Sequence, residues 1–424
     1  MANLLKIPEI HDATKRACGP MSSHLEESDL PVLVLGSGIT ALGVIRSLGS
    51  AQIPAYSLCP RNDLVTQSRW YRPAPQISSR VPSPDELPEY LATLSIPKAV
   101  LIPCTDDWTK AVAGLPENLK ERFPASISPP LVVETMINKW RFAETLQQLG
   151  VPRPRTILLH SLEEMAVLPD SQYENMFLKP LDSLQFSACH GVKAFRVESK
   201  RYALEIMAKT QRNGTSGFPI LLQEYIPGPA RSYYLVDGFV DRHHRICALI
   251  ARRRLRMHPQ MFGNSTLSES VPVHQVRGAV DTLERLWSAL DYRGIFDAEF
   301  KYDDCDGQFK IVEVNARPWW HIGFTTGCGV NLCRMSYRDA LGLPVESITS
   351  YPVGRRALYL LLDLPAHCAT DPGVAGLLRW MRSWKGAQDA IYCWNDPRPG
   401  IWVTLASFKR VRRALQIFRS ALWP

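Results

Sequence analysis

The sequence predicts a multidomain protein of mixed α/β and α+β class, and three observations lead to this prediction. The chain has 424 residues, too many for one small core, which indicates roughly two to four domains. Residues 31–49, PVLVLGSGITALGVIRSLG, read as a short apolar strand, a glycine turn and an amphipathic helix. After residue 150, short apolar runs follow one another with few helices between them, as in antiparallel sheets.

The first of these regions is expected to be a Rossmann-like domain spanning residues 31–130. Dinucleotide binding would require an acidic residue about 20 positions after the glycine turn, whereas residues 54–60 read PAYSLCP. This favours a structural role for the glycines, in a tight turn that packs helix on sheet, over NAD binding. The apolar run AVLIPC at residues 99–104 supplies a further parallel strand.

The second region is expected to span residues 131–345 as two lobes. The smaller lobe, about residues 135–218, begins with a helix capped by Asn138, and the larger lobe covers about residues 219–345. A long helix is expected at residues 273–290. Residues 346–424 form a separate extension that is rich in proline and tryptophan.

Composition and charge limit the class of protein. With 46% hydrophobic and 21% charged residues, and without an apolar run of eighteen residues, the chain reads as a globular protein with no membrane span. Residues 1–30 lack the uninterrupted apolar stretch of a signal peptide and are expected to be a disordered leader, which favours a cytoplasmic location. The net charge of +8 comes without a recognisable nucleic-acid reader motif, so no nucleic acid partner is expected.

The ten cysteines are scattered and form no CxxC pair, which favours reduced thiols over disulfides or a zinc site. Cys328 and Cys333 are the two candidates for a nucleophile or metal ligand. No matching set of cysteine and histidine accompanies them, so a structural role is favoured.

The most informative segment is FKIVEVNARPWW, residues 309–320, in which Glu313, Asn315 and Arg317 alternate and therefore share one face of a strand. The turn-rich hexapeptide DDCDGQ before it predicts a β-hairpin that sets Glu299 nearly opposite Glu313. Two carboxylates about 5 Å apart repel by roughly 3 kcal/mol at an effective dielectric near 20. A divalent cation would reverse that term, and the alternative is an edge hairpin whose polar face is solvated.

Lysines upstream suit a polyphosphate ligand. Lys179 closes the strand MFLKP, and a loop leads from it to Lys193 at the start of the next strand. Lys139 begins the helix after Asn138 and supplies another cation, unless it is an ordinary solvated lysine.

The run ILLQEYIP, residues 220–227, ends an apolar strand in polar groups. Main-chain atoms from Glu224 to Ile226 suit the edge of an adenine, with Leu221 and Ile226 on either side of its ring. The alternative is a buried strand that simply leaves its sheet.

The order of these pieces, from Pro31 to Gly342, resembles the ATP-grasp superfamily of ligases. Within it the E-x-N-x-R form of residues 313–317 is similar to the carbamoyl-phosphate-synthase and D-aspartate-ligase branch, with support from FLKP and QEYIPG. The resemblance implies a pre-ATP-grasp domain followed by a two-lobed ATP-grasp domain that uses ATP and Mg²⁺, with Mn²⁺ as a substitute. The implied residues are Lys139, Lys179 and Lys193 on the phosphates, Gln223, Glu224, Tyr225 and Ile226 on the adenine, Glu299, Glu313 and Asn315 on the metal, and Arg317 with Lys179 in catalysis.

Two features depart from the family pattern. Many members have an acidic ribose ligand shortly after the adenine strand, whereas Arg231 stands near that position here and Asp237 lies farther along the next strand. The phosphate loop reads FSACHG where a run of glycines is common. A stiffer loop, slower turnover or a lost activity would each fit these changes.

The resemblance implies an ADP-forming ligase. A carboxylic acid would attack the γ-phosphate of ATP, and an amine or another nucleophile would capture the acyl phosphate. The alternative is a catalytically weak ATP-binding protein with a regulatory or scaffold role at a membrane surface. The sequence identifies neither the acid nor the nucleophile, and an oligomer is compatible with it.

Three further segments carry expectations. The arginines of residues 252–256 alternate along a strand and either approach the site or form a solvated basic edge. Trp319, Trp320 and His321 either shape the acceptor side or pack between lobes. Residues 407–423 form a basic amphipathic helix, for which docking on the protein itself is favoured over contact with an anionic membrane.

Overall fold

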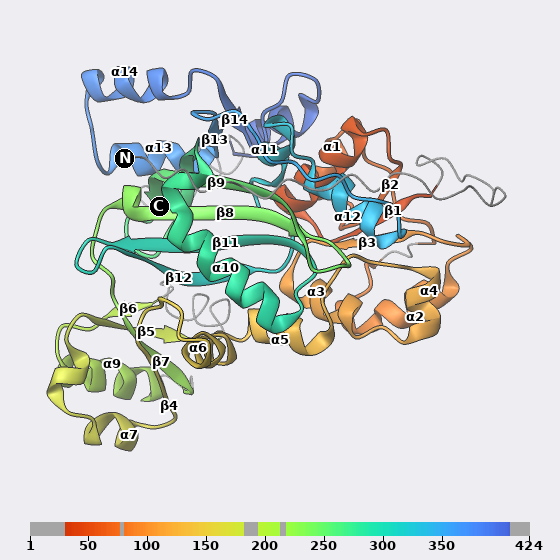
Figure 1. Cartoon of the computed structure of the whole chain (residues 1–424). Coiled ribbons are helices and arrows are strands. Elements are labelled where there is room, and N and C mark those ends of the chain that lie inside the picture. The colour runs from red at the N-terminus through yellow and green to blue at the C-terminus, as the bar shows by residue number, and fades with distance from the viewer. Residues whose placement is uncertain (1–29, 77–79, 182–193, 213–217, 408–424) are drawn as a thin grey trace, which may run out of the picture.

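The computed structural model describes residues 30–76, 80–181, 194–212 and 218–407 (Figure 1). The predicted leader, Lys193 with most of the phosphate loop, and the basic C-terminal helix lie outside the described residues. None of the described helices is both long and apolar enough to traverse a bilayer.

The N-terminal region forms a parallel three-stranded sheet in the order β2-β1-β3, as expected for a Rossmann-like unit. Its strands and main helices are β1 (Val32–Leu35), α1 (Gly38–Ser50), β2 (Ala55–Leu58), α2 (Leu87–Thr93), β3 (Val100–Pro103), α3 (Asp106–Ala113) and α4 (Glu117–Arg122). Val32 and Val34 pack on the α1 side of the sheet, and Leu33 and Leu35 pack on the α2 and α3 side.

The glycine turn before α1 has a local geometric reason. Gly36 and Gly38 both have positive φ, at 127° and 72°. A Cβ atom on Gly36 would also lie 3.1 Å from the Cβ atom of Cys104. Both positions therefore favour glycine for the backbone conformation alone.

The smaller lobe is an antiparallel sheet in the order β4-β7-β5-β6, at the lower left of Figure 1. Its elements are α5 (Pro130–Ile137), α6 (Lys139–Gln148), β4 (Thr156–Leu159), α7 (Leu162–Val167), β5 (Met176–Pro180), β6 (Phe195–Arg196), α9 (Lys200–Arg212) and β7 (Ile220–Glu224), with α5 and α6 leading into it. The expected cap is present, because Asn138 accepts the N–H groups of Trp140 and Arg141.

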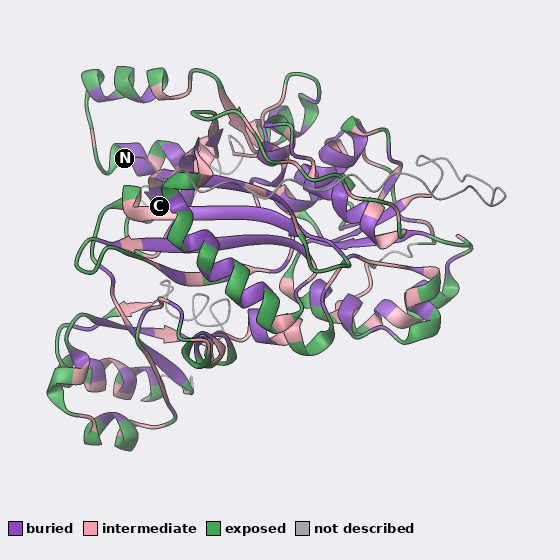
Figure 2. Ribbon diagram, viewed as in Figure 1, coloured by how far each residue is buried: buried purple, intermediate pink, exposed green. Residues whose placement is uncertain are grey.

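The larger lobe is a seven-stranded sheet in the order β12-β11-β8-β9-β10-β13-β14, antiparallel except for its last pair. The elements are β8 (Tyr233–Val240), β9 (Ile246–His258), β10 (Asn264–Val271), α10 (Arg277–Leu290), β11 (Gly294–Asp303), β12 (Gln308–Asn315), β13 (Arg356–Leu358) and β14 (Ala387–Asp389). Helix α10 covers one face of this sheet, and Figure 2 shows its inner side buried and its outer side exposed. The predicted mixture of parallel and antiparallel architecture is confirmed.

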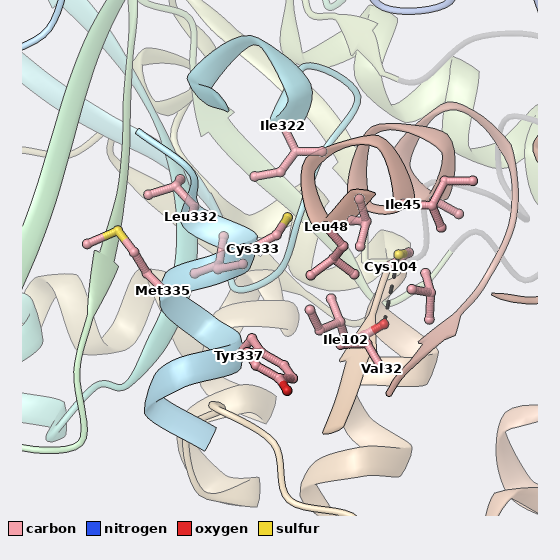
Figure 3. Packing of buried hydrophobic residues seen from close by; sticks show 14 of the residues in the cluster. Val32, Ile45, Leu48, Ile102, Cys104, Ile322, Leu332, Cys333, Met335 and Tyr337 are labelled. Carbon is pink, nitrogen blue, oxygen red and sulfur yellow. Dashed lines mark hydrogen bonds between the residues drawn. The ribbon is translucent and has the colours of Figure 1, made fainter. Parts of the chain in front are cut away.

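A continuous core joins the N-terminal sheet to the helices after β12. The helices in this core are α11 (Ile322–Gly327) and α12 (Leu332–Ala340). Helices α13 (Leu360–Cys368) and α14 (Val374–Ser383) follow later in the chain. Figure 3 shows Cys333 and Tyr337 of α12 beside Ile102 and Leu48, with Ile322 above them. Burial raises the pKa of the Cys333 thiol to about 12 and that of Cys328 to about 11, as expected for structural thiols.

Candidate functional site

The hairpin of β11 and β12 pairs as the sequence predicts. Glu299 lies directly opposite Glu313, and Asp297 lies opposite Asn315. The register shifts just after Glu299, so that Phe300 pairs with Ile311. This irregularity leaves the polar residues on one face while Phe300 and Ile311 enter the core beneath α10.

Exposure differs between the two facing glutamates. The Glu299 side chain is 23% exposed, and Glu313 is exposed on the edge strand. Burial raises the pKa of Glu299, an effect that Arg254 opposes and that Glu313 and Asp297 reinforce. The predicted facing of Glu299 with Glu313 is confirmed, and their role as metal ligands stays a prediction.

The arginine run is not a solvated basic edge. Arg252 is fully buried, and its guanidinium donates to Asp237 at 2.5 and 2.8 Å and to Asp297 at 3.3 Å. Arg254 donates to Glu299 Oε2 at 2.6 Å and to Ser265 Oγ at 2.7 Å. The interpretation that these guanidiniums approach the hairpin is therefore correct for two of them.

The remaining arginines of the run have other partners. Arg253 donates to Glu269 at 2.6 Å, and Arg256 pairs with the buried Asp363 of α13. Alternation along β9 therefore sets apart only Arg253, whereas Arg256 differs from Arg252 and Arg254 through its contact with Asp363.

Asp297 connects the buried arginine to a predicted metal ligand. The Asn315 side chain donates from Nδ2 to Asp297 Oδ2 at 3.0 Å. This bond fixes the orientation of the amide, so that Oδ1 is directed away from Asp297. Burial raises the pKa of Asp297 well above its usual range, and the neighbouring Asp237 charge raises it further, while Arg252 opposes both.

Charges of both signs meet on this face. Four carboxylates, Asp237, Asp297, Glu299 and Glu313, lie beside the guanidiniums of Arg252 and Arg254, and the charges of Lys301 and Arg317 also act on this group. Among the described residues no three His, Cys, Asp or Glu side chains form a complete metal-binding group. Two carboxylates and one amide would suit Mg²⁺ with phosphate oxygens and water as its other ligands.

Four of the predicted residues meet in one small pocket between the lobes. Lys139, Lys179, Gln223 and Glu313 line this space, which holds about 30 Å³. Lys139 donates to the carbonyl oxygen of Pro180 at 3.2 Å and to that of Leu181, so this half-buried lysine is tied to the end of β5. The pocket is far smaller than a nucleotide.

Two backbone N–H groups at the end of β7, the strand predicted to bind adenine, already have hydrogen-bond partners. The Glu224 N–H donates to Arg155 O at 2.8 Å, and the Tyr225 N–H donates to Asn175 O at 2.6 Å. Gln223 donates from Nε2 to Thr156 Oγ1, whereas its buried Oε1 has no hydrogen-bond partner among the described residues. The N–H groups of Glu224 and Tyr225 are therefore occupied, and Gln223 Oε1 is not.

Arg317 is paired with the N-terminal domain. Its guanidinium donates to Asp106 of α3 at 2.6 and 3.3 Å. Arg231 is exposed, and Asp237 is fully buried on Arg252, so Asp237 does not act as a ribose ligand. The structure thus separates Arg317 and Arg231 from the small pocket.

Trp319, Trp320 and His321 were predicted either to shape the acceptor side or to pack between lobes, and the structure places them differently. Trp319 is buried with the Arg252 guanidinium 5.6 Å from its ring centroid, and His321 is buried with Nε2 3.4 Å from Ser265 O. Trp319 is thus a packing residue. Trp320 meets Tyr359 edge to face, and Trp320 and the buried His321 line one large cavity.

Three charged residues of the site were not predicted from the sequence, namely Asp297, Lys301 and Asp106. Asp297 and Lys301 alternate with Glu299 along β11, and this spacing could have identified them. Lys301 is buried beside the rings of Tyr225 and Tyr233, and burial lowers its pKa to about 8. No local signal announces Asp106, because its partner is 211 residues away.

Comparison with known proteins agrees with this architecture. Residues 217–358 match the family described as ATP-grasp in the biosynthetic pathway with Ter operon. The D-aspartate ligase of Enterococcus faecium is 24% identical over 340 residues, which are 75% of this chain and 78% of that protein. Among solved structures, the L-amino acid ligase from Bacillus licheniformis has a TM-score of 0.57 at 15% identity, covering 78% of this chain and 79% of that chain. Carboxyaminoimidazole ribonucleotide synthase from Aspergillus clavatus complexed with ATP has a TM-score of 0.58 at 16% identity, covering 78% and 81%.

Proposed function

Because this chain belongs to the ATP-grasp superfamily of ligases, we propose that it is an ADP-forming ligase that joins a carboxylic acid to an amine or another nucleophile. One observation carries the proposal, namely that Glu299 and Glu313 face each other across the hairpin. Two facing carboxylates repel each other, and a divalent cation bound between them would turn that repulsion into attraction.

In this proposal Glu299, Glu313 and Asn315 hold Mg²⁺, or Mn²⁺ in its place. The bound ion would draw charge from the phosphate oxygens of ATP. Lys139 and Lys179 border the same pocket as Glu313 and would neutralise the phosphates. Gln223 Oε1, which is buried and finds no partner in the described part of the chain, would accept from the adenine amino group.

The reaction needs little covalent chemistry from the protein. A substrate carboxylate oxygen forms a bond to the γ-phosphorus, and the bond from that phosphorus to the β-phosphate oxygen breaks to release ADP. The nucleophile then bonds to the acyl carbon, and phosphate leaves. Arg317 would stabilise the acyl phosphate, which requires it to exchange its contact with Asp106 for the substrate.

Measuring ADP release over a panel of carboxylic acids and amines tests the proposal. Glu313→Gln should lower the rate at least about a hundredfold, because a neutral amide cannot replace the carboxylate ligand. Glu89→Gln, an exposed glutamate on α2, is the matched control and should leave the rate unchanged. If nucleotide stabilises the protein but no acid elicits release that depends on Glu313, the ligase proposal is wrong.

A catalytically weak ATP-binding protein is the second candidate. The observation that favours it is the Arg317–Asp106 pair, which occupies the guanidinium proposed for catalysis. In that case Asp106→Asn would leave the protein as inactive as before. In a ligase, the same change would alter the rate of ADP release.

A further inference from the structure

Exposed apolar side chains are concentrated in the C-terminal extension. Fourteen large apolar side chains of the described residues are exposed, and only Leu131, Val167, Tyr202 and Met261 among them precede residue 346. The other ten fall within residues 346–407, which are a small part of the described chain. Exposed apolar residues gathered in this way mark a surface that contacts a partner.

Helix α14 carries four of these side chains in one stripe. Val374, Leu377, Leu378 and Met381 follow the three- and four-residue spacing of a single helix face. Their exposed fractions are 78%, 42%, 46% and 44%. Figure 2 shows α14 largely exposed, at the upper edge of the molecule. The stripe therefore faces away from the body of the protein.

A different side of α14 anchors the helix. Trp380 is buried, and its indole N–H donates to Asp363 of α13 at 2.8 Å. The Trp380 ring also stacks on His367, with 5.5 Å between the ring centroids. Gly376 packs so closely that a Cβ atom there would lie 2.1 Å from the carbonyl oxygen of Asp371. These contacts hold the helix without using the apolar stripe.

The charge of the extension is mainly positive. Residues 346–424 contain eleven lysines and arginines and five acidic residues, so they hold +6 of the chain's net charge of +8. Three of the acids are already paired, Asp363 with Arg256, Asp396 with Arg46 and Asp371 with Arg379. A fourth, Asp389, accepts the backbone N–H groups of Leu360, Ile391 and Tyr392. Little negative charge is left to oppose an anionic partner.

Two of the cations border the stripe. Arg382 belongs to the last turn of α14 and Lys385 follows it, and both side chains are exposed. Neither forms an ion pair within the described part of the chain. A helix with an apolar stripe beside arginine and lysine is typical of those that lie on anionic lipid, where the apolar side chains enter the interface and the cations stay among the headgroups.

Other covers for the stripe fit its charges less well. Residues 408–424 contribute five cations and no acidic residue, so like charge opposes their binding beside Arg382 and Lys385. A second copy of the chain would bring the same cations to the same stripe. A nucleic acid would pair with the cations and leave the aliphatic side chains in water.

We propose that the C-terminal extension docks this protein on an anionic lipid surface, with the stripe of α14 entering the interface. Val374, Leu377, Leu378 and Met381 lie among the headgroups and the upper part of the acyl chains, and Arg382 and Lys385 contact the lipid phosphates. The docking surface shares no residue with the ATP site, so lipid binding and the ligase reaction are tested separately.

Vesicle flotation with the full chain and without nucleotide tests the proposal. The protein should float with vesicles of phosphatidylserine and phosphatidylcholine in equal parts, and not with vesicles of phosphatidylcholine alone. Leu377→Ser combined with Leu378→Ser should raise the lipid concentration for half-maximal flotation at least about tenfold, and so should Arg382→Gln combined with Lys385→Gln. Val167→Ser on the smaller lobe and Lys98→Gln on the N-terminal domain, both at exposed positions, are the matched controls and should change nothing.

The basic C-terminal residues provide a further comparison, because they attract anionic vesicles without any help from α14. If Arg412→Gln combined with Arg413→Gln abolishes flotation while the leucine variant floats like the wild type, the assignment to α14 is wrong. If Trp394→Ser, at a fully exposed position, weakens flotation and the leucine variant does not, another part of the extension makes the contact.

Two more results would overturn the proposal. Equal flotation with both kinds of vesicle, or flotation with neither, would show that the partner is not an anionic lipid surface. The leucine variant should also unfold at the same Tm as the wild type, because its side chains are exposed. A clear fall in Tm would mean that the stripe packs within the protein and is not a docking surface.

Discussion

Asp297 is the residue through which the buried arginine reaches the predicted metal ligands. Asp297→Asn preserves its shape but removes the carboxyl group that pairs with Arg252 and loosens the hold on Asn315. The Mg²⁺ concentration for half-maximal ADP release should rise about tenfold to a hundredfold. A magnesium titration measures this, with Asp304→Asn in the exposed hairpin turn as the control. An unchanged magnesium requirement would mean that Asp297 serves stability alone.

His321 should make the protein sensitive to acid. Burial lowers its pKa to about 3, and Arg252 adds to this, so the folded protein holds the ring neutral. The unfolded chain binds the proton near pH 6.5, so this stability is complete above pH 6.5 and is lost as the pH falls from 6.5 toward 3. Between pH 7 and 5 the wild type should lose about 2 kcal/mol more unfolding free energy than His321→Asn.

Urea unfolding at the two pH values measures the difference. His243→Asn, at an exposed histidine, should follow the wild type at both pH values. Parallel losses in the wild type and His321→Asn would show that another group controls the acid response.

At the scale of elements, the hairpin depends on the helix behind it. Leu283 of α10 is fully buried in the cluster that contains Phe300 and Ile311. Leu283→Ala should lower the free energy of unfolding by about 2–5 kcal/mol through the lost contacts and the cavity left behind. Urea denaturation checks this against Ser288→Ala on the exposed side of the helix. A loss below about 1 kcal/mol would show that the helix can collapse onto the gap.

The elements themselves were largely predictable, because their signals are local. The turn DDCDGQ and the alternation of Glu313 and Asn315 predicted the hairpin and the facing of Glu299 with Glu313. The alternation of Arg252 and Arg254 left two faces equally plausible. Only the neighbouring strand β8, which places Asp237 beside Arg252, decides between them. Pairing between distant strands is not encoded in either strand alone.

At the scale of the whole molecule, the cavity and the contacts between domains could not be predicted from the sequence. The large cavity exists because α1 and residues 386–405, more than 300 positions apart, enclose it together. Likewise Arg317 reads as a catalytic residue in sequence and is found paired with Asp106 of another domain. Such contacts depend on how complete domains dock, which no periodicity or turn signal reveals.

The small volume of the pocket between the lobes leads to a prediction about lobe movement. The lobes touch where Phe262, at the tip between β9 and β10, meets Phe177 at 4.8 Å and Tyr225 at 6.3 Å between ring centroids. Because the pocket beside Lys179 and Glu313 holds only about 30 Å³, we expect nucleotide to bind a more open arrangement of the lobes. Any contact that favours the closed arrangement then reduces the apparent affinity.

Phe262→Ala should therefore tighten ADP binding, even though it removes an apolar side chain. Aromatic pairs of this kind contribute about 0.5–1.5 kcal/mol each, so the gain should be roughly twofold to tenfold. Isothermal titration with ADP measures it, and Met261→Ala, at the exposed neighbouring position, is the control. Weaker binding by Phe262→Ala would instead place its ring against the nucleotide, and the lobe contact would then be part of the binding site rather than a restraint on it.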